Sequence, residues 1–382
     1  MLIAADKFKG SLTAAEVAAR VAAGLARGGF AGTTVAVPVA DGGDGTVAAA
    51  LGAGFGRAEV KVHGPAGDPV TAAYALRDEV AVIEAAQACG LTLLPAAQRA
   101  PLTATSRGVG ELILAARRAG ARRIVLGVGG VATTDGGAGL LQALGARLTD
   151  ESGQELPPGG GPLARLAALD LGGLADLTDV EFLLASDVDN PLLGPLGAAA
   201  VYGPQKGATP AQVPLLEAGL RRWADIAEAG AAEAGALDAG AAGGPGRDAP
   251  GAGAAGGLGF AALLFLRARR RPGIELLLEL AEFGSRLGGA RLVITGEGSL
   301  DAQTLHGKAP VGVARAAAAH VPPVPVVAVA GRCPLTAAQL RAAGIARAYP
   351  LTDIEADPAR CLAQAGPLLE QVAMRIAADW LG

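Results

Sequence analysis

The sequence LLASDVDNPLLGPLGAAAVYGPQKG, residues 183–207, joins an apolar segment to two polar loops. The apolar run Phe182–Ala185 has the length and composition of a buried strand. Where this run ends the chain becomes acidic, because Asp187, Asp189 and Asn190 fall within four residues. Carboxylates at the point where a strand passes into a loop can face a cleft without the cost of burying their charge.

The later part of the same segment is a loop with a single lysine. Gly203–Gly207 reads GPQKG, and such a loop can present backbone N–H groups and the Lys206 ammonium to an anion. Oxygen ligands for a hard cation, together with an anion-binding loop, favour phosphoryl transfer. The structural alternatives are a turn closed by an aspartate side chain and a solvated lysine loop.

Composition restricts the class of protein. The chain has 382 residues, about two domains by length, with 51% hydrophobic and 18% charged residues. A net charge of −4 and 3% aromatic residues argue against nucleic acid as a partner. The three cysteines and three histidines form no CxxC or HExxH pattern, which argues against a zinc site or a disulfide framework.

Targeting and membrane segments are also not expected. Met1–Asp6 leads directly into a strand and has no signal-peptide pattern. The longest apolar stretch, Phe260–Leu266, is too short to span a bilayer. We therefore expect a cytoplasmic protein with no membrane partner.

Both ends of the chain read as alternating strands and helices. A capping box, Thr13 with Glu16, begins the first helix. Such a series predicts a parallel sheet with ligands at the carboxyl ends of its strands. The strands expected in these regions are 2–5, 35–39, 292–295, 326–330 and 346–350.

The middle of the chain begins with short strands at 59–62, 70–76 and 80–84, which read as antiparallel neighbours. The predicted fold class is therefore α/β, with two α/β domains around a cleft. One is a discontinuous, Rossmann-like parallel-sheet domain, residues 1–63 and 290–382, and the other is an inserted domain with a mixed sheet, residues 64–289. The Ala/Gly-rich tract 230–257 is compatible with a linker or with an ordered loop.

Glycine-rich polar loops follow several of the predicted strands, as in DGGDGT at 41–46 and GGVATTDGGAG at 129–139. Their backbone N–H groups can converge on an anion, and tight packing is the alternative. Arg107, at a predicted helix start, either clamps a carboxylate or phosphate or is an exposed arginine. The Walker sequence and the glycine loop of protein kinases are missing.

Eight motifs in this order resemble the type 1 bacterial glycerate kinase family, and they extend over essentially the whole chain. The motifs are DKFKGSL (6–12), DGGDGT (41–46), TSRGVGELI (105–113), GGVATTDGG (129–137), SDVDNPL (186–192), YGPQKGA (202–208), GAGAAGGLG (251–259) and GEGSLD (296–301). The resemblance implies ATP- and Mg²⁺-dependent phosphorylation of D-glycerate, with 2-phosphoglycerate as the product in the usual members. It also implies two α/β domains, one of them discontinuous.

Motif membership and side-chain chemistry together give the expected roles. Asp189 is the expected general base, and Asp187 and Lys7 complete the catalytic set. Substrate binding is assigned to Arg107, Ser106, Asp6, Lys9, Ser11, Asp41 and Asp44. Nucleotide or phosphate binding is assigned to Gly129, Gly130, Thr133, Thr134, Gly136, Gly137, Lys206, Gly296 and Glu297. The expected Mg²⁺ ligands are Asp187, Asp135 and Asp301.

Two other functions fit the same residues. One is a kinase of a different small hydroxy acid, and the other is a non-catalytic sensor of a nucleotide or sugar acid. A sensor has no need of the paired carboxylates Asp187 and Asp189, so this pair favours an enzyme.

Overall fold

The computed structural model describes residues 1–233 and 246–381, which form two compact units. Unit 1 comprises Met1–Asp41, Ala48–Phe55 and Pro272–Gly382, and unit 2 comprises Gly42–Val47 and Gly56–Arg271. Part of the Ala/Gly-rich tract, residues 234–245, lies outside the described residues. An α/β fold with a parallel-sheet unit and a mixed-sheet unit was predicted, and this fold class is confirmed.

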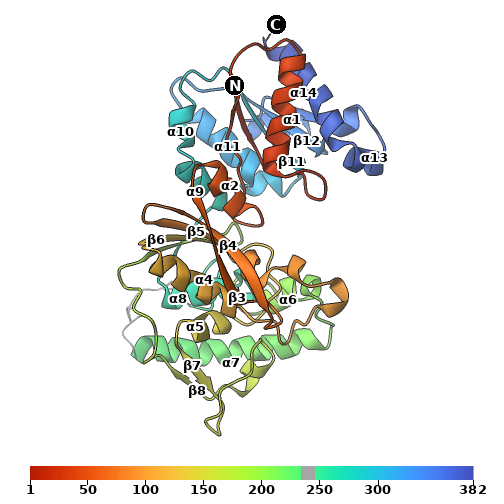
Figure 1. The fold of residues 1–382 in the computed structure, drawn as a ribbon. Helices are drawn as coiled ribbons and strands as arrows, with labels where there is room; N and C mark the ends of the chain where they lie inside the picture. Colours follow the sequence, from red (N-terminus) through yellow and green to blue (C-terminus); the bar gives the residue numbers. More distant parts are fainter. Residues whose placement is uncertain (234–245, 382) are drawn as a thin grey trace. The chain divides into compact units, whose positions relative to one another are not determined.

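Unit 1 contains a parallel sheet in the order β13-β12-β11-β1-β2. Two of its strands, β11 and β12, are labelled in Figure 1. Its strands are β1 (Leu2–Ala5), β2 (Val35–Ala36), β11 (Val293–Ser299), β12 (Val326–Arg332) and β13 (Arg347–Pro350). Ile3 is in register with Ala36 on one side and with Ile294 on the other. The strand predicted at 35–39 is shorter than expected, because Pro38 has no N–H group with which to extend the ladder.

The helices of unit 1 follow the predicted alternation. They are α1 (Ala14–Arg27), α2 (Thr46–Gly52, which begins in unit 2), α9 (Gly273–Leu280), α10 (Phe283–Arg286), α11 (Ala309–Ala318), α12 (Ala337–Ala342), α13 (Pro358–Ala363) and α14 (Ala365–Leu381). The capping box of α1 is confirmed: the Glu16 N–H donates to Thr13 Oγ1, and the Thr13 N–H donates to Glu16 Oε2.

Helices α1 and α14 lie side by side (Figure 1). Gly24 allows this approach, because a Cβ atom there would overlap the Glu370 carbonyl oxygen and lie 2.6 Å from Ala373 Cβ. Arg20 and Arg27 of α1 both pair with the Glu370 carboxylate, at 2.8 and 2.5 Å. Helix contact and charge pairing therefore join the two ends of the chain.

Unit 2 contains a mixed sheet in the order β10-β9-β6-β5-β4-β3. Its strands are β3 (Gly56–His63), β4 (Pro69–Arg77), β5 (Val80–Glu84), β6 (Arg123–Gly127), β9 (Glu181–Ala185) and β10 (Arg269–Arg271). The antiparallel pairing of β3 with β4 and of β4 with β5 was predicted and is confirmed, and the remaining neighbours are parallel. Strands β7 (Arg147–Thr149) and β8 (Ala168–Asp170) form a separate small sheet.

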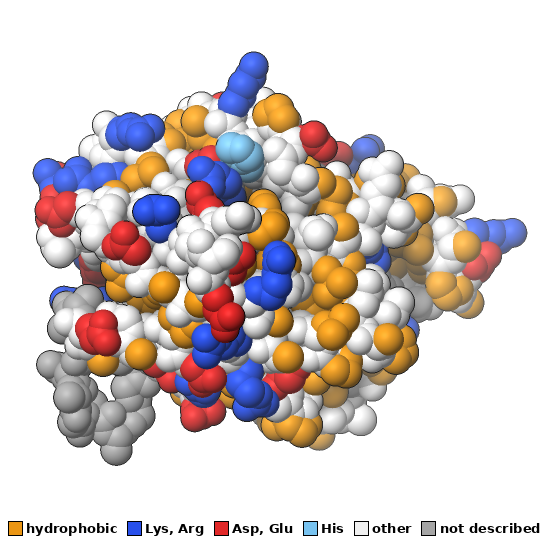
Figure 2. All heavy atoms as spheres, turned by 90° about the horizontal axis from the view of Figure 1, so that it is seen from below, with side chains coloured by type: hydrophobic (Ala, Val, Ile, Leu, Met, Phe, Trp, Pro, Cys, Tyr) orange, Lys and Arg blue, Asp and Glu red, His pale blue; other side chains and the backbone are white. Residues whose placement is uncertain are grey.

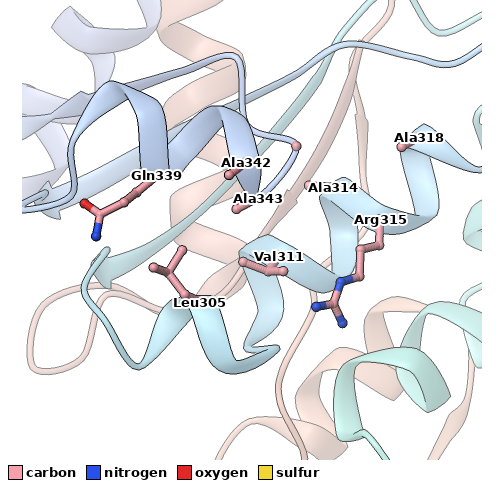
Figure 3. Close-up of a pocket in the computed structure, with 9 residues that line it drawn as sticks. Leu305, Val311, Ala314, Arg315, Ala318, Gln339, Ala342 and Ala343 are labelled. Atoms are coloured by element: carbon pink, nitrogen blue, oxygen red, sulfur yellow. The ribbon is translucent and has the colours of Figure 1, made fainter.

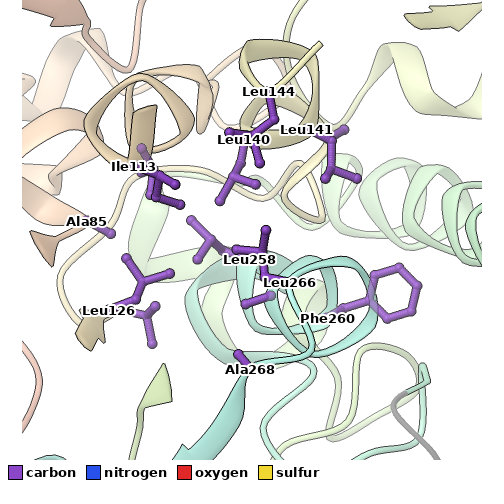
Figure 4. Packing of buried hydrophobic residues seen from close by; sticks show 14 of the residues in the cluster. Ala85, Ile113, Leu126, Leu140, Leu141, Leu144, Leu258, Phe260, Leu266 and Ala268 are labelled. Atoms are coloured by element: carbon purple, nitrogen blue, oxygen red, sulfur yellow. The ribbon is translucent and has the colours of Figure 1, made fainter. Parts of the chain in front are cut away.

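The core of unit 2 lies between this sheet and its helices. The helices are α3 (Ala86–Cys89), α4 (Arg107–Arg118), α5 (Ala138–Ala143), α6 (Ala198–Tyr202), α7 (Gln212–Glu233) and α8 (Ala254–Phe265). Figure 4 shows Ile113 of α4, Leu140 of α5 and Leu258 of α8 in one shared apolar space. Burial of this apolar surface is the main stabilising contribution in the unit.

The predicted domain bounds differ from the bounds of the two units at both places where the chain passes from one domain to the other. Strand β3, placed by the sequence in the terminal domain 1–63, pairs with β4 and belongs to unit 2. Residues 272–289, placed in the inserted domain 64–289, belong to unit 1, where Ile274 of α9 contacts Gly312 of α11. These bounds are set by the pairing of β3 with β4 and by the packing of α9 on α11. A change in strand length along the sequence does not reveal such long-range contacts.

The face seen in Figure 2 carries charges of both signs among hydrophobic side chains. Figure 2 shows Lys and Arg side chains interspersed with Asp and Glu side chains over one face. Of the helices in the described ranges, not one has the length and apolar character needed to cross a membrane.

The contact between α1 and α14 yields a stability prediction. Gly24→Val should lower the melting temperature, because overpacking at a close helix contact costs about 1–3 kcal/mol. Ala19→Val is the matched control, because Ala19 is exposed on the same helix and the introduced side chain is the same. Differential scanning calorimetry measures both, and equal melting temperatures would contradict the close approach.

Candidate functional site

Three carboxylates gather at the carboxyl edge of the unit 1 sheet. Asp6 follows β1 directly, Asp41 ends the segment after β2, and Glu297 lies in the last part of β11. Burial, and then the neighbouring Asp41 carboxylate, raise the pKa of Asp6 to about 7. Burial also raises the pKa of Glu297, with smaller contributions from Asp301 and Asp41. Grouped carboxylates of this kind favour a proton or a cation among them.

The GEGSLD motif forms the wall beside this acidic cluster (Asp6, Asp41 and Glu297). Thr304 Oγ1 donates to Glu297 Oε1, and the positive charge of Lys308 partly offsets the raised pKa of Glu297. Asp301 Oδ2 accepts a hydrogen bond from Ser299 Oγ at 3.2 Å. Sequence reasoning missed Thr304 and Lys308, although both lie within eleven residues of Glu297.

The DKFKGSL loop closes on itself after Asp6. The Lys7 N–H donates to Asp6 Oδ1 at 2.7 Å, and Ser11 Oγ donates to the Phe8 carbonyl at 3.1 Å. Gly10 has a φ of +84°, which a residue with a side chain rarely adopts. Lys9 is exposed at the tip of this loop.

In unit 2, a buried carboxylate organises the loop 129–139. Asp135 is fully buried, and its Oδ2 accepts from both the N–H and the hydroxyl of Ser106 at 2.8 Å. The N–H groups of Gly137 and Gly139 also donate to this carboxylate, at 3.2 and 3.3 Å. Burial raises the pKa of Asp135, while the hydrogen bonds from Ser106 oppose that shift. Through these contacts Asp135 and Ser106 stabilise the loop 129–139. The predicted roles of Asp135 as a metal ligand and of Ser106 in substrate binding stay predictions.

Lys206 is buried beside the same loop. Its Nζ donates to the Thr133 carbonyl at 2.5 Å, and burial lowers its pKa to about 8. Gly256 of α8 can lie close to Lys206 only because glycine has no Cβ atom. A Cβ atom there would lie 2.8 Å from Lys206 Nζ. The hydroxyls of Thr133 and Thr134 are buried and have no hydrogen-bond partner among the described residues. A buried cation and two donor hydroxyls thus meet at the carboxyl end of β6.

The DGGDGT motif lies on the boundary between the units, with Asp41 in unit 1 and Gly42–Val47 in unit 2. In unit 2, the N–H groups of Gly45 and Val47 both donate to Glu84 Oε2 at 3.1 Å. The Gly129 N–H donates to the Gly42 carbonyl at 3.2 Å, so two predicted glycine loops are in backbone contact. Glu84 was not predicted, although a lone glutamate ending the apolar strand β5 is a usable signal.

The two aspartates of SDVDNPL are exposed, and Asp189 has an identified partner. Its Oδ1 lies 2.6 Å from Arg270 Nη1, and Arg270 also donates to the Val188 carbonyl at 2.9 Å. Arg270 lies in β10, the strand that pairs in parallel with β9, and Asp189 lies in the loop after β9. Sequence reasoning missed Arg270, since the run of three arginines at 269–271 does not reveal which one faces Asp189.

Arg107 is placed away from the buried groups. Its Nε lies 3.5 Å from Glu111 Oε1, which is also 2.6 Å from His63 Nδ1. His63 and Glu111 line a cavity of about 550 Å³ on unit 2, together with Lys61 and Arg118. The structure therefore brings Ser106 next to Asp135 and leaves the neighbouring Arg107 in a separate ion-pair group.

A second cavity, of about 440 Å³, lies between α11 and α12 (Figure 3). Its walls are mainly Ala314, Ala318, Ala342 and Ala343, and among the described residues that line it Arg315 alone is charged. Small apolar walls with one charge supply little for recognising a polar substrate.

The described part of the chain offers few side chains grouped as metal donors. Within residues 1–233 and 246–381, no group of three or more His, Cys, Asp or Glu side chains is arranged to hold a metal ion. Mg²⁺ is usually held by one or two carboxylates together with substrate phosphates. The acidic cluster of Asp6, Asp41 and Glu297, in which burial and the Asp41 charge raise the pKa of both Asp6 and Glu297, fits that mode of binding.

Comparisons with known proteins point to one family. Residues 1–381 match the model of the Glycerate kinase family. The chain is 46% identical over 336 residues to the glycerate kinase of Bacillus subtilis (strain 168), covering 87% of this chain and 84% of that one. It is 43% identical over 328 residues to the glycerate 2-kinase of Escherichia coli (strain K12), covering 85% and 83%.

A solved structure shares the whole fold. The crystal structure of a Salmonella typhimurium LT2 protein assigned as glycerate kinase 2 has a TM-score of 0.83, 40% identity, and coverage of 99% of this chain and 97% of that chain. Fold and relatives together define a kinase, an enzyme that transfers a phosphoryl group. The chain belongs to the glycerate kinase family.

The raised pKa of Asp6 predicts a pH-dependent stability. Between the ordinary aspartate value, 3.8, and about 7, the folded state keeps a proton on Asp6 that the unfolded state has lost. This contribution to stability is fully present below pH 4 and is lost as the pH rises through 7. Asp6→Asn removes the titration, so its melting temperature relative to the parent should increase from pH 5 to pH 8.

The control for this series is Asp353→Asn, because Asp353 is an exposed aspartate in the same unit. Its melting temperature relative to the parent should not change between the two pH values. Added Mg²⁺ at pH 8 should stabilise the parent more than Asp6→Asn, because the cation would neutralise the acidic cluster. A pH-independent difference for Asp6→Asn would show that Asp6 is already ionised at pH 5.

Proposed function

We propose that this protein transfers the γ-phosphoryl group of ATP to D-glycerate, with 2-phosphoglycerate as the product and Mg²⁺ as the required cation. One observation carries the proposal. Within each unit, several motif loops lie at the carboxyl ends of parallel strands: DKFKGSL after β1 and GEGSLD at the end of β11 in unit 1, and GGVATTDGG after β6 and SDVDNPL after β9 in unit 2. Open α/β sheets bind ligands at these strand ends. The printed names of the relatives, glycerate kinase and glycerate 2-kinase, support the substrate.

Phosphoryl transfer needs positioning and charge neutralisation more than covalent chemistry from the protein. Mg²⁺ would be held by phosphate oxygens and by carboxylates of the Asp6, Asp41 and Glu297 cluster, with Asp301 of the same unit as a further candidate. When bound, the cation supplies charge neutralisation on the transferred group. Lys7 and Lys9 add positive charge on the same loop.

Asp189 is the proposed general base. It accepts the proton of the glycerate hydroxyl as that oxygen bonds to the γ-phosphorus, and the bond from that phosphorus to the bridging oxygen of ADP breaks. In the described conformation Arg270 pairs with Asp189 at 2.6 Å. A glycerate carboxylate that competes for the planar Arg270 guanidinium would release Asp189 for this role.

Lys206 and Asp135 act as positioning residues in this proposal. Lys206 is 3% exposed, and its ammonium is bonded to the Thr133 carbonyl, so it holds the loop 129–139 from inside. The loop held in this way can present backbone N–H groups to an anion.

The substrate and product are tested first. ADP release should depend on both D-glycerate and Mg²⁺, and L-glycerate, glycolate and D-lactate serve as the comparison panel. Phosphorus NMR with proton coupling distinguishes the products, because the phosphorus of 2-phosphoglycerate couples to one proton and that of 3-phosphoglycerate to two. Equal ATP turnover with and without glycerate would exclude the proposed function.

The base is tested by a pair of substitutions. Asp189→Asn should lower kcat by about 10²–10⁴-fold, the usual range for a positioned acid or base, while glycerate still binds. Asp248→Asn is the control, because Asp248 is an exposed aspartate elsewhere in unit 2. If Asp187→Asn abolishes turnover and Asp189→Asn does not, the two roles are exchanged. Near-normal kcat in both variants would remove this loop from the mechanism.

A further inference from the structure

A cavity of about 290 Å³ opens at the carboxyl edge of the unit 1 sheet. Its walls come from the loop after β1, the ends of β11 and β12, the segment after β13, and α13 with the start of α14. In the order β13-β12-β11-β1-β2, the chain adds strands in one direction from β1 to β2 and in the other from β11 onward. Open parallel sheets bind ligands at such a switch point, outside the carboxyl ends of the strands.

The inner walls of this cavity are largely apolar. Phe8, Leu351, Pro358 and Leu362 line it, and the first two are almost completely buried. Leu362 is 53% exposed, so a ligand bound against it would remove apolar surface from water. These walls suit the faces of a flat, weakly polar ring.

Glycines keep part of the cavity open. Gly298 and Gly331 contribute backbone only, and a Cβ atom on Gly331 would lie 2.6 Å from the Gly298 carbonyl oxygen. The two strand ends therefore meet with no side chains between them, so a ligand can approach the backbone there.

The charged lining residues are both cations. Lys9 and Arg332 line the cavity, and its lining, all within the described chain, includes no Asp or Glu. Arg332 Nε donates to Ser299 Oγ at 3.0 Å, and Ser299 in turn donates to Asp301. The GEGSLD motif thus holds Arg332 at the cavity, where its guanidinium suits a phosphate group.

We propose that this cavity binds the nucleoside of ATP, with its phosphates beside Lys9 and Arg332. The inference rests on the proposed function, and it adds that unit 1 is the nucleotide-binding unit. Glycerate is a poor occupant, because its carboxylate and hydroxyls would lose their hydrogen bonds to water against apolar walls. A nucleotide joins a flat ring to a polyanion, which matches apolar walls beside two cations.

The acidic cluster agrees with this orientation. Asp6 precedes Phe8 by two residues, and Glu297 directly precedes Gly298, so the carboxylates and the cavity share one edge of the same sheet. Phosphates beside Lys9 and Arg332 would lie on the edge that carries the carboxylates suited to Mg²⁺.

Binding measurements separate the ring from the phosphates. Titration calorimetry with adenosine and with ADP is carried out on the full chain in the presence of Mg²⁺. Leu362→Ala should weaken both ligands about fivefold, because it removes apolar contact with the ring. Arg332→Gln should weaken ADP about tenfold and leave adenosine unchanged, because only phosphates contact the guanidinium.

Two control variants and a labelling experiment complete the test. Leu196→Ala removes an exposed leucine in unit 2, and Arg315→Gln removes an exposed arginine on α11, so both should bind as the parent does. Photolabelling of the parent protein with 8-azido-ADP, followed by peptide mapping, should mark residues 351–365. This experiment does not depend on the folding of any variant. Labelling confined to other peptides, or parental affinity in Leu362→Ala, would overturn the assignment.

This test also distinguishes the two proposals. Normal glycerate-dependent turnover with labelling elsewhere removes this cavity as the nucleotide site and leaves the proposed function. Labelling at 351–365 without glycerate-dependent turnover removes the proposed function and supports the nucleotide site.

Discussion

The buried Asp135 carboxylate is the interaction on which unit 2 depends. It is fully buried and accepts hydrogen bonds from Ser106 and from the N–H groups of Gly137 and Gly139. An ionised carboxylate is tolerated in an apolar core only when its oxygens are satisfied in this way. Ser106 immediately precedes α4, and Gly139 lies in α5, so one side chain fixes two helix starts and the loop that follows β6.

Close backbone contact is the second constraint, and glycine makes it possible. The Gly129 N–H bonds to the Gly42 carbonyl, and the Gly136 N–H bonds to the Gly256 carbonyl at 3.0 Å. A Cβ atom on Gly129 would overlap Gly43 Cα, and one on Gly256 would overlap the Thr133 carbonyl. Glycine at these positions therefore first packs the loops of unit 2 against one another. The N–H groups that remain available are the ones that can bind phosphate.

Both units carry carboxylates and cations at the edges where their strands end, but the buried groups among them differ. Unit 1 brings Asp6, Asp41 and Glu297 together. Burial raises the pKa of Asp6 and of Glu297. Unit 2 gathers the buried Lys206 and the hydroxyls of Thr133 and Thr134. Phosphoryl transfer uses both kinds of group, since a cation must be held and phosphate oxygens must be neutralised. Membership of a kinase family accords with this division.

The sequence alone determined the alternation of strands and helices, the capping box at Thr13, the antiparallel strands from residue 59 onward and the family. These features depend on local propensity, on periodicity and on motif order, all of which are written along the chain. Tertiary structure decided which polar residues are partners: Ser106 and Lys206, expected to face ligands, are buried around Asp135 and Thr133, and Asp189 pairs with Arg270. Glu84 and Arg332 are likewise defined by distant partners: Glu84 accepts from the N–H groups of Gly45 and Val47, and Arg332 donates to Ser299. Residues about 30 to 80 positions apart meet only when the sheet order brings their strands together, and no local pattern encodes that order.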